Sequence, residues 1–401
     1  MVIRPKYIIL PIILFITTWI VWGVYNYAFD ISKPELTIYG LENDGYCSGE
    51  THCIIKGKDE YKVSDISVWL DGSLIVNKFK VNKKEFEHQL PLFTKSLPNG
   101  KHLLKIEVVD SSYNKNRSIK EINFKVDNVP LQAVFLKPNN EYKVFQGKTL
   151  HLQFQVNKDI KDAKINLLSK TFECFPESKA SSIYECYIPI SCEEIPNEYP
   201  LTILITDYTG KVLNLDGKFQ IIPFPFKKQI LNIGAQKVKE AEAVGIKQEI
   251  LEEEIAELVK KSPKQKLWQG EFYIPMEMTK LTCDYGTKRI TQEKGCYMHK
   301  AVDIIGMPKT VIWAPQDGVI IIKNLYVQSG NTVVIDHGYG VFTLLYHLDK
   351  FANINVGEKI KKGNPVGTMG KTGYATGYHL HWEMRINNVH TDPMQWVKCD
   401  F

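Results

Sequence analysis

Two histidines near the C-terminus are the first residues whose types and spacing could do chemistry. If the segment from His379 to Glu383 is a β-strand, His379, His381 and Glu383 share one face, because side chains alternate along a strand. Leu380 and Trp382 then face the core. Two imidazoles side by side are suited to metal binding and to general-base work. An H-x-H pair can also be fortuitous, so the pair needs further donors.

A second pair of polar residues supplies those donors. Asp303 stands between Val302 and Ile304 in a predicted strand, and His299 lies in the loop before it. A carboxylate in such surroundings is costly to bury unless it is paired or binds a metal. The alternative is a turn carboxylate that caps a backbone amide. With His381 the two motifs offer three ligands, the number that a catalytic zinc typically takes from the protein.

The remaining histidines of this region are candidates for proton transfer. Zinc lowers the pKa of its bound water toward ~7 and polarises a carbonyl group. Peptide hydrolysis then needs a base for the water proton and an acid for the leaving amine. His347 and His379 are the available candidates. His337 and His390 are predicted to be structural or solvent-exposed.

These motifs resemble the LytM/lysostaphin-type (M23) zinc metallopeptidase family. Its pattern pairs H-x-x-x-D with a distant H-x-H and places a further histidine between them, within a frame of glycine-rich turns. The resemblance implies a zinc metalloendopeptidase (Zn2+ as cofactor) that hydrolyses peptide bonds in peptidoglycan cross-links or cross-bridges. It implies zinc ligands at His299, Asp303 and His381. It also implies that His347 and His379 form the catalytic pair, which orients water and stabilises the oxyanion.

The resemblance covers about residues 270–397 and has three departures. Ala301 replaces the usual glycine of H-x-G-x-D. The tyrosine that usually stands two residues before the third histidine is shifted to Tyr346, and Tyr378 stands where proline is common. None of these changes removes a ligand, so they concern substrate fit rather than metal binding.

Two other functions remain open at this point. One is a non-catalytic LytM-like regulator that activates other wall hydrolases, and the other is a peptidase that acts on an envelope protein. Degenerate relatives usually lose ligands, whereas this chain retains all five polar residues. That favours the enzyme over the regulator, but it does not separate the two substrates.

The elements that must position these residues form a mostly β pattern. We predict an N-terminal transmembrane helix, two immunoglobulin-like β-sandwiches, a helical connector and a C-terminal antiparallel β LytM-like domain. The predicted parts are residues 1–30, 31–127, 128–227, 228–264 and 265–401. We expect the isolated domain 265–401 to be at least as active as the whole ectodomain, and a clearly lower activity with folding intact would rule out simple occlusion of the site.

The two predicted sandwiches rest on short alternating runs separated by turn signals. The runs lie at residues 66–70, 103–109, 150–156 and 201–205. We find no catalytic constellation in them. Spacing or docking is therefore the preferred role, with envelope proteins as the partners that they could bind.

The stretch from Lys237 to Lys261 is rich in helix-forming residues. Leu251, Ile255, Leu258 and Val259 fall on one helical face. Val244-Gly245-Ile246 could interrupt the helix. A solvated connector is favoured over a partner-binding helix.

The first thirty residues predict the compartment. Arg4 and Lys6 precede an apolar run from Tyr7 to Phe29, which is long enough to cross a bilayer. Bulky aromatic residues stand where a cleavage site would need small ones. This predicts an uncleaved single-pass anchor in the bacterial cytoplasmic (inner) membrane, with the catalytic domain in the periplasm. The formal net charge of +5 is small, and no nucleic-acid partner is expected.

The eight cysteines are consistent with export. None forms a C-x-x-C pair, which disfavours structural zinc and thioredoxin-like sites. Their clustering predicts local disulfides in an oxidising compartment. The predicted pairs are Cys47 with Cys53, Cys174 with Cys186 or Cys192, and Cys283 with Cys296.

Overall fold

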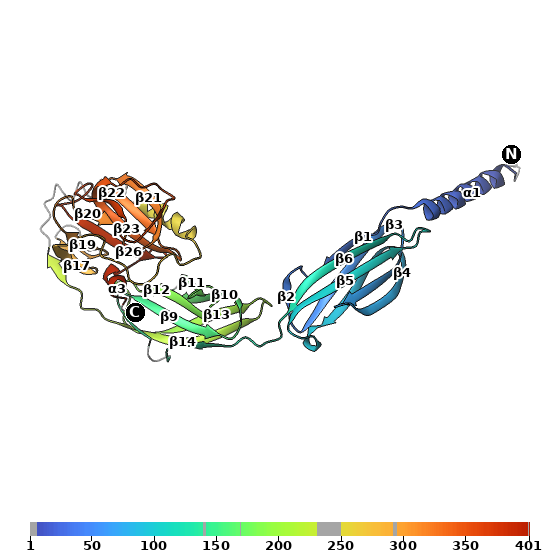
Figure 1. Ribbon diagram of the computed structural model, residues 1–401, viewed down its shortest axis with the longest axis horizontal. Helices are drawn as coiled ribbons and strands as arrows, with labels where there is room; N and C mark the ends of the chain where they lie inside the picture. Colours follow the sequence, from blue (N-terminus) through green and yellow to red (C-terminus); the bar gives the residue numbers. More distant parts are fainter. Residues whose placement is uncertain (1–5, 139–141, 169, 231–249, 292–294, 400) are drawn as a thin grey trace. The chain divides into compact units, whose positions relative to one another are not determined.

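The structure is a computed structural model that describes residues 6–138, 142–168, 170–230, 250–291, 295–399 and 401 (Figure 1). Its contacts divide the chain into two compact units. The first comprises Met1–Leu131 with Asp207–Lys211, and the second comprises Gln132–Thr206 with Val212–Phe401.

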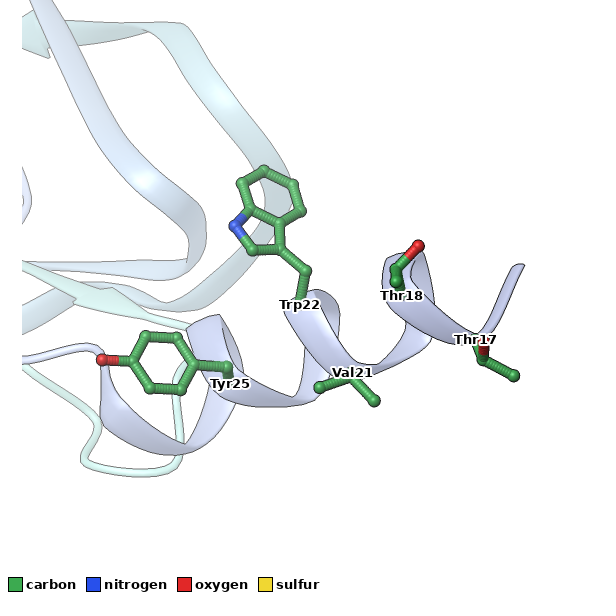
Figure 2. Close-up of a pocket in the computed structure, with 5 residues that line it drawn as sticks. All are labelled: Thr17, Thr18, Val21, Trp22 and Tyr25. Carbon is green, nitrogen blue, oxygen red and sulfur yellow. The ribbon is translucent and has the colours of Figure 1, made fainter. Parts of the chain in front are cut away.

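Helix α1 (Lys6–Phe29) begins the described chain. Among the described residues, no helix combines the length and the apolar character that crossing a membrane requires. The transmembrane anchor predicted for residues 1–30 is therefore without support from the structure. A hollow along α1 is lined by Thr17, Thr18, Val21, Trp22 and Tyr25 (Figure 2). These side chains include no carboxylate, imidazole or thiol, so the hollow is not a candidate catalytic site.

The first unit contains a six-stranded sheet with its own apolar core. Its order is β1-β3-β5-β6-β2, and β4 pairs with β3. A tight turn at Asp71-Gly72, with φ values of 51° and 81°, joins the two longest strands, as in two-residue hairpin loops. Alternate residues of β5 are buried, so one face of the sheet carries the core. The strands are β1 (Glu35–Tyr39), β2 (Gly45–Cys47), β3 (Glu50–Leu70), β4 (Ser73–Phe93), β5 (Gly100–Asp110) and β6 (Arg117–Val126), with a 3-10 turn η1 (Thr94–Ser96) after β4.

The second unit begins with an eight-stranded sheet of order β7-β9-β12-β11-β10-β13-β14-β8. All four predicted strand runs lie within strands of the structure, which confirms the β-rich pattern of residues 31–223. The immunoglobulin-like class stays a prediction. The strands are β7 (Ala133–Phe135), β8 (Lys143–Phe145), β9 (Thr149–Val156), β10 (Ile160–Leu167), β11 (Lys170–Pro176), β12 (Ile183–Pro189), β13 (Glu198–Asp207) and β14 (Val212–Ile222).

The C-terminal domain is built on a ten-stranded, mainly antiparallel sheet whose main path is β16-β19-β26-β23-β22-β21-β24. Strands β15, β17 and β18 form a separate three-stranded sheet in the order β15-β17-β18. The strands are β15 (Lys228–Ile230), β16 (Lys280–Cys283), β17 (Thr287–Thr291), β18 (Gly295–His299), β19 (Val302–Ile305), β20 (Val311–Trp313), β21 (Gly318–Tyr326), β22 (Gly330–Asp336), β23 (Val341–Phe351), β24 (Lys359–Ile360), β25 (Pro365–Met369), β26 (Leu380–Ile386) and β27 (Val389–Thr391), followed by helix α3 (Pro393–Lys398).

The predicted connector is part of this domain. Residues 250–260 form a helix, and residues 231–249, with the predicted interruption at 244–246, lie outside the described residues. Leu251 and Ile255 are fully buried against a cluster that includes Ile322 and Phe342, which confirms the predicted apolar face. The prediction of a solvated connector is wrong, because the apolar face of this helix packs on the ten-stranded sheet. Residues 228–230 are also not helical, since they form β15 and pair with β17.

The second β region packs against the C-terminal domain. The side chain of Gln395 in α3 accepts a hydrogen bond from the backbone N–H of Thr149 at 2.6 Å and donates one to its carbonyl at 3.0 Å. Lys266 lies 2.8 Å from the buried carboxylate of Glu185. Tyr187 packs against Trp268 and Trp396. This region therefore supports the C-terminal domain rather than only spacing it.

All eight cysteines are free thiols, so the predicted disulfides are wrong. The topology gives the reason for two of them. Cys47 lies in β2 and Cys53 in β3, and these strands are not neighbours in the sheet. Cys283 is buried in the ten-stranded sheet, whereas Cys296 is exposed on β18 in a different sheet.

Candidate active site

A row of polar residues crosses three adjacent strands of the ten-stranded sheet. Cys283 on β16 is paired with Asp303 on β19, and Asp303 is paired with His381 on β26. Directly opposite residues on antiparallel strands project from the same face. The register therefore brings together side chains that are far apart in the sequence, and it continues to Tyr346 on β23.

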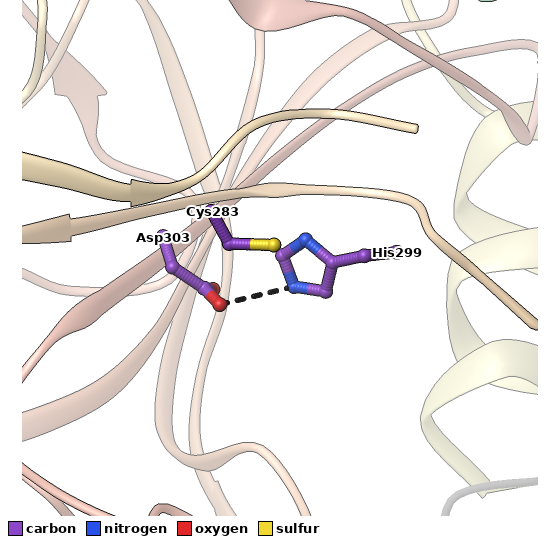
Figure 3. Close-up of side chains that lie close together, drawn as sticks. All are labelled: Cys283, His299 and Asp303. Carbon is purple, nitrogen blue, oxygen red and sulfur yellow. Dashed lines mark ion pairs between the residues drawn. The ribbon is translucent and has the colours of Figure 1, made fainter. Parts of the chain in front are cut away.

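His299, the last residue of β18, completes the group. Its ring Nε2 lies 3.2 Å from Oδ2 of Asp303 (Figure 3). His299 is only 5% exposed, yet neither of its ring nitrogens has a hydrogen-bond partner of good geometry within the described structure. Buried polar atoms are usually hydrogen-bonded, so an orphaned imidazole beside a carboxylate is an observation that fits a metal ligand.

Asp303 is the hub of this group. Its Oδ1 lies 2.9 Å from Nδ1 of His381, and its Oδ2 accepts a hydrogen bond from Nη2 of Arg289 at 3.0 Å. His299, Asp303 and His381 thus form a compact set of two imidazoles and one carboxylate. The three predicted ligands are brought together, and their donor types suit zinc.

The two predicted catalytic histidines lie beside this set. The ring centroids of His347 and His379 are 4.8 Å apart, and those of His347 and His381 are 5.9 Å apart. Nε2 of His379 lies 3.9 Å from Oδ1 of Asp303. All five predicted site residues therefore meet in one place, on the polar face that the alternation of β26 predicts.

The comparisons with known proteins agree with this geometry. Residues 297–393 match the model of peptidase family M23. The C-terminal domain belongs to peptidase family M23. The peptidoglycan DD-endopeptidase ShyC of Vibrio cholerae serotype O1 is 34% identical over 121 residues, which are 30% of this chain and 28% of that protein. The DD-carboxypeptidase/endopeptidase Mpg of Neisseria meningitidis serogroup B is 33% identical over 127 residues, which are 31% of this chain and 29% of that protein.

The likeness to these relatives is confined to a part of each. The chain spans less than a third of the length of the two curated relatives. A solved structure of a peptidase M23 from Pseudomonas aeruginosa is 20% identical and covers 63% of this chain and 94% of that chain, with a TM-score of 0.46.

Backbone carbonyls fix the tautomers of the two catalytic candidates in the M23 domain. Nδ1 of His347 lies 2.8 Å from the carbonyl of Thr372, and Nδ1 of His379 lies 2.9 Å from that of Gly377. A carbonyl can only accept, so each Nδ1 carries the proton and donates it. When such a ring is neutral, its Nε2 is a proton acceptor.

The backbone of His347 explains how β23 serves the M23 site with two consecutive residues. Neighbouring strand residues normally point to opposite faces. Tyr346 stacks on His381 with 5.2 Å between ring centroids, so regular geometry would turn His347 away. His347 instead has a φ of 63°, an uncommon value for a residue other than glycine, which breaks the alternation. Tyr346, the tyrosine whose position is shifted relative to the family pattern, therefore packs against the predicted ligand His381.

Burial and neighbouring charges set the protonation states of the M23 site. Burial, reinforced by the charges of His381 and His379, lowers the pKa of His347 to about 3. Burial opposes the charged form of His381, but hydrogen bonds to Asp303 and Glu383 raise its pKa to about 9. Although burial favours its protonated form, the neighbouring imidazoles of His299 and His381 hold the pKa of Asp303 far below its usual range. His347 is thus held neutral beside a charged group of ligands.

A layer of charged residues supports His381 from behind. Its Nε2 lies 3.2 Å from Oε1 of Glu383, whose other oxygen accepts a hydrogen bond from Nη2 of Arg385 at 2.6 Å. Arg385 is 1% exposed, and Glu252 of the helix at 250–260 binds it through both oxygens, at 2.5 and 2.8 Å. His390 also lies 3.3 Å from Glu383. Such carboxylate partners fix the orientation of a metal-binding imidazole.

Two residues of the site escaped the sequence analysis. The ligand atom of Cys283 lies within 4.8 Å of those of His299 and Asp303 (Figure 3). Arg289 binds Asp303. Neither has a local sequence signal, since only the register of β16 with β19 and the adjacent small sheet bring them here. Burial opposes the thiolate of Cys283, but the neighbouring imidazole of His299 and the charge of Arg289 lower its pKa.

The remaining histidines of the domain have structural roles. His337 is fully buried, with Nδ1 2.7 Å from the carbonyl of Asp317 and Nε2 2.9 Å from Oγ1 of Thr343. His390 belongs to the layer behind His381. Both agree with the prediction that they are not site residues, although neither is freely exposed.

Proposed function

We propose that this protein is a zinc metalloendopeptidase that hydrolyses peptide cross-links or cross-bridges of peptidoglycan outside the cytoplasm. The observation that carries the proposal is the convergence of His299, Asp303 and His381 on one side and the rings of His347 and His379 on the other. Membership of the M23 family supports peptidase chemistry at this place.

The donor set fits zinc, and the chain supplies the groups that must move protons. His299, Asp303 and His381 would hold the metal, which when bound acidifies a water molecule and polarises the scissile carbonyl. Nε2 of neutral His347 can take the proton of the attacking water, because its Nδ1 is committed to Thr372. The resulting imidazolium can pass that proton to the leaving amine. His379 lies beside the same space, where its ring can hydrogen-bond the developing oxyanion once Nε2 is protonated.

The substrate assignment rests on the relatives. Two of them, at 34% and 33% identity, are named as a peptidoglycan DD-endopeptidase and a DD-carboxypeptidase/endopeptidase. A regulator of other wall hydrolases is the second candidate, but it would not need the complete set of five polar residues. A peptidase for an envelope protein is the third, and only a substrate experiment separates it from the first.

The test is mass spectrometry of purified peptidoglycan after digestion with the zinc-loaded full-length protein. We expect new peptide-cleaved fragments, whose masses identify the bond. His381→Ala should lose both metal and cleavage, whereas His347→Ala should keep the metal and lose cleavage. His52→Ala changes an exposed histidine of the first unit and is the matched control, which should cleave like wild type.

The outcome that overturns the enzyme is also defined. If wild type releases no fragments while its fold and zinc content are intact, peptidoglycan cleavage is rejected. Stimulation of a separate wall hydrolase by both wild type and His347→Ala would then establish the regulator. Cleavage of envelope proteins by wild type alone would establish the third candidate.

A further inference from the structure

Three aspartates from distant parts of the sequence converge in the first unit. Asp30 follows α1, Asp59 lies within β3, and Asp110 is the last residue of β5. One carboxylate oxygen of each lies within 4.8 Å of those of the other two. Asp59 and Asp110 are buried, at 4% and 0% exposure. The group is unrelated to the M23 site and was not singled out by any sequence motif.

Each carboxylate is held in place through its Oδ1 atom, and Oδ2 of Asp110 also accepts a hydrogen bond from the side chain of Asn116 at 2.7 Å. Oδ1 of Asp30 accepts from the backbone N–H of Ser32, Oδ1 of Asp59 from that of Tyr61, both at 2.9 Å, and Oδ1 of Asp110 from that of Ser112 at 3.0 Å. The Oδ2 atoms of Asp30 and Asp59 are buried and have no hydrogen-bond partner among the residues that the structure describes. Backbone N–H groups therefore fix the orientation of the Asp30 and Asp59 carboxylates, while their Oδ2 atoms stay unpaired among the described residues.

No cationic side chain among the described residues compensates the charge of the group. Within the described ranges, no lysine, arginine or histidine forms an ion pair with any of the three aspartates. Burial, with the charges of Asp30 and Asp110 adding to it, raises the pKa of Asp59. Buried carboxylates are normally paired or coordinate a metal, since an isolated one is very costly.

A second turn of the chain, at Asp207, shows which hydrogen bonds of these aspartates serve only to form a turn. Oδ1 of Asp207 accepts from the backbone N–H groups of Thr209 and Lys211, at 2.9 and 3.0 Å, as Oδ1 of Asp110 does from Ser112 and Asn116. A buried aspartate that anchors a turn is therefore a device that this chain uses elsewhere. The unpaired oxygens of Asp30 and Asp59 are additional, and turn formation does not account for them.

We propose that Asp30, Asp59 and Asp110 bind a calcium ion. Oxygen-only donors select hard cations, and Ca2+ accepts six to eight oxygen ligands in flexible geometry, whereas Mg2+ demands a near-ideal octahedron. Carboxylates from three separate segments form an irregular cage that suits calcium. Backbone carbonyls and water would complete the shell.

The site would tie the end of α1 to the sheet. The backbone N–H of Tyr113 already donates to the carbonyl of Tyr27 in the last turn of α1, at 2.9 Å. The side chains of Asn114 and Asn116 donate to the carbonyl of Asp30. A cation on Asp30 would strengthen this attachment, because it links the residue after α1 to β3 and β5 at once.

Three tyrosines provide a direct probe. The ring centroid of Tyr27 lies 6.1 Å from that of Tyr61 and 6.3 Å from that of Tyr113. These rings belong to the same segments as the aspartates. A Tb3+ ion bound in place of Ca2+ would therefore be excited through tyrosine and would emit its characteristic luminescence.

The experiment uses the zinc-loaded full-length protein after removal of other metals. We expect tyrosine-sensitised Tb3+ emission that Ca2+ abolishes by competition and that excess Mg2+ does not. Asp59→Asn keeps the shape of the side chain and should weaken Ca2+ binding at least about tenfold. Asp44→Asn, an exposed carboxylate of the same unit, is the matched control and should bind like wild type.

Stability gives an independent readout, because a ligand that binds only the folded state raises the unfolding temperature. Ca2+ should raise the unfolding transition of the first unit in wild type and in Asp44→Asn but not in Asp59→Asn. Without Ca2+, Asp59→Asn should be at least as stable as wild type, since it removes an uncompensated charge. If Asp59→Asn does not fold, Asp30→Asn replaces it. Absence of both Tb3+ emission and a Ca2+-dependent shift in wild type, or unchanged binding in the variants, overturns the proposal.

Discussion

Cys283 adds a fourth donor to a site for which the family resemblance implied three. Its thiol lies in register with Asp303 and close to His299. Thiolate sulfur is a zinc ligand, and four protein ligands close a zinc site, whereas a catalytic site keeps one position open. We expect Cys283→Ser to retain the metal through the other three ligands and to hydrolyse peptidoglycan at least as fast as wild type.

Cobalt substitution tests this expectation without relying on activity. The cobalt-loaded full-length protein should show sulfur-to-cobalt charge-transfer absorption, and Cys283→Ser should lack it. Cys296→Ser, which removes an exposed thiol of β18, is the control and should keep the absorption. A wild-type spectrum without this absorption would mean that the metal takes no sulfur ligand.

His337 gives a pH dependence that can be isolated from the metal site. Burial lowers its pKa to about 4, against an unfolded value of ~6.5. The unfolded chain therefore binds the extra proton between these values, and stability is lost as the pH falls from about 6.5 to 4. The loss is on the order of 3 kcal/mol. Burial raises the pKa of neighbouring Asp336 to about 6, which acts in the opposite direction, since the folded state then takes up the proton first.

A variant separates the effect of His337 on stability from the opposing effect of Asp336. We expect His337→Gln to gain stability relative to wild type as the pH falls from 6.5 to 4, whatever its stability at neutral pH. Hydrogen exchange of the peptides that cover β22 and β23, followed by mass spectrometry across this pH range, measures it in the full chain. Parallel pH profiles of the two proteins would contradict the assignment of a buried neutral imidazole.

The site residues that could be predicted from the sequence are those that lie in short, recognisable motifs. His299 and Asp303, and His379 and His381, lie in short motifs, so their types and spacing identified them. Cys283 was instead assigned to a disulfide, because nothing near it in the sequence reveals its partner Asp303 across the β16–β19 register. The three aspartates of the first unit were missed for the same reason.

At the scale of elements, the helix at 250–260 shows what periodicity can and cannot predict. Its apolar face was predicted, but its docking on the sheet was not, since periodicity identifies a face and not what covers it. Leu251 is fully buried, so Leu251→Ala should destabilise the M23 domain by about 2–5 kcal/mol. Ile250 on the same helix is 58% exposed, and Ile250→Ala should change stability by less than about 0.5 kcal/mol.

Urea unfolding followed by tryptophan fluorescence compares the two variants, because Trp313 and Trp382 report on the M23 domain. Both substitutions shorten an aliphatic side chain to alanine, so helix propensity changes little in either case. Equal effects of the two substitutions would show that the helix is not packed in solution as it is in the structure.

At the scale of the whole molecule, the boundary of the functional unit moves. The sequence indicated an independent domain at 265–401, because the motifs and the glycine-rich frame lie within it. The structure adds β15, which pairs with β17, and the helix that carries Glu252. It also adds the contacts of Thr149 and Glu185 with the C-terminal domain. These contributions come from sequence too distant for any local pattern to assign them.

The expectation that residues 265–401 alone are at least as active as the whole ectodomain therefore changes. This fragment lacks Glu252, so Arg385, at 1% exposure, loses its bidentate partner next to Glu383 and His381. A buried charge that loses a hydrogen-bonded partner destabilises the fold. The fragment also exposes the apolar surface that Leu251 and Ile255 cover. We expect it to unfold at a lower temperature and to bind zinc more weakly than a fragment of residues 132–401. Calorimetry and zinc titration of both fragments measure this difference. If the two fragments match in both properties, the helix and the second β region serve only to hold the peptidase domain, and the charged layer behind His381 is not needed for the metal site.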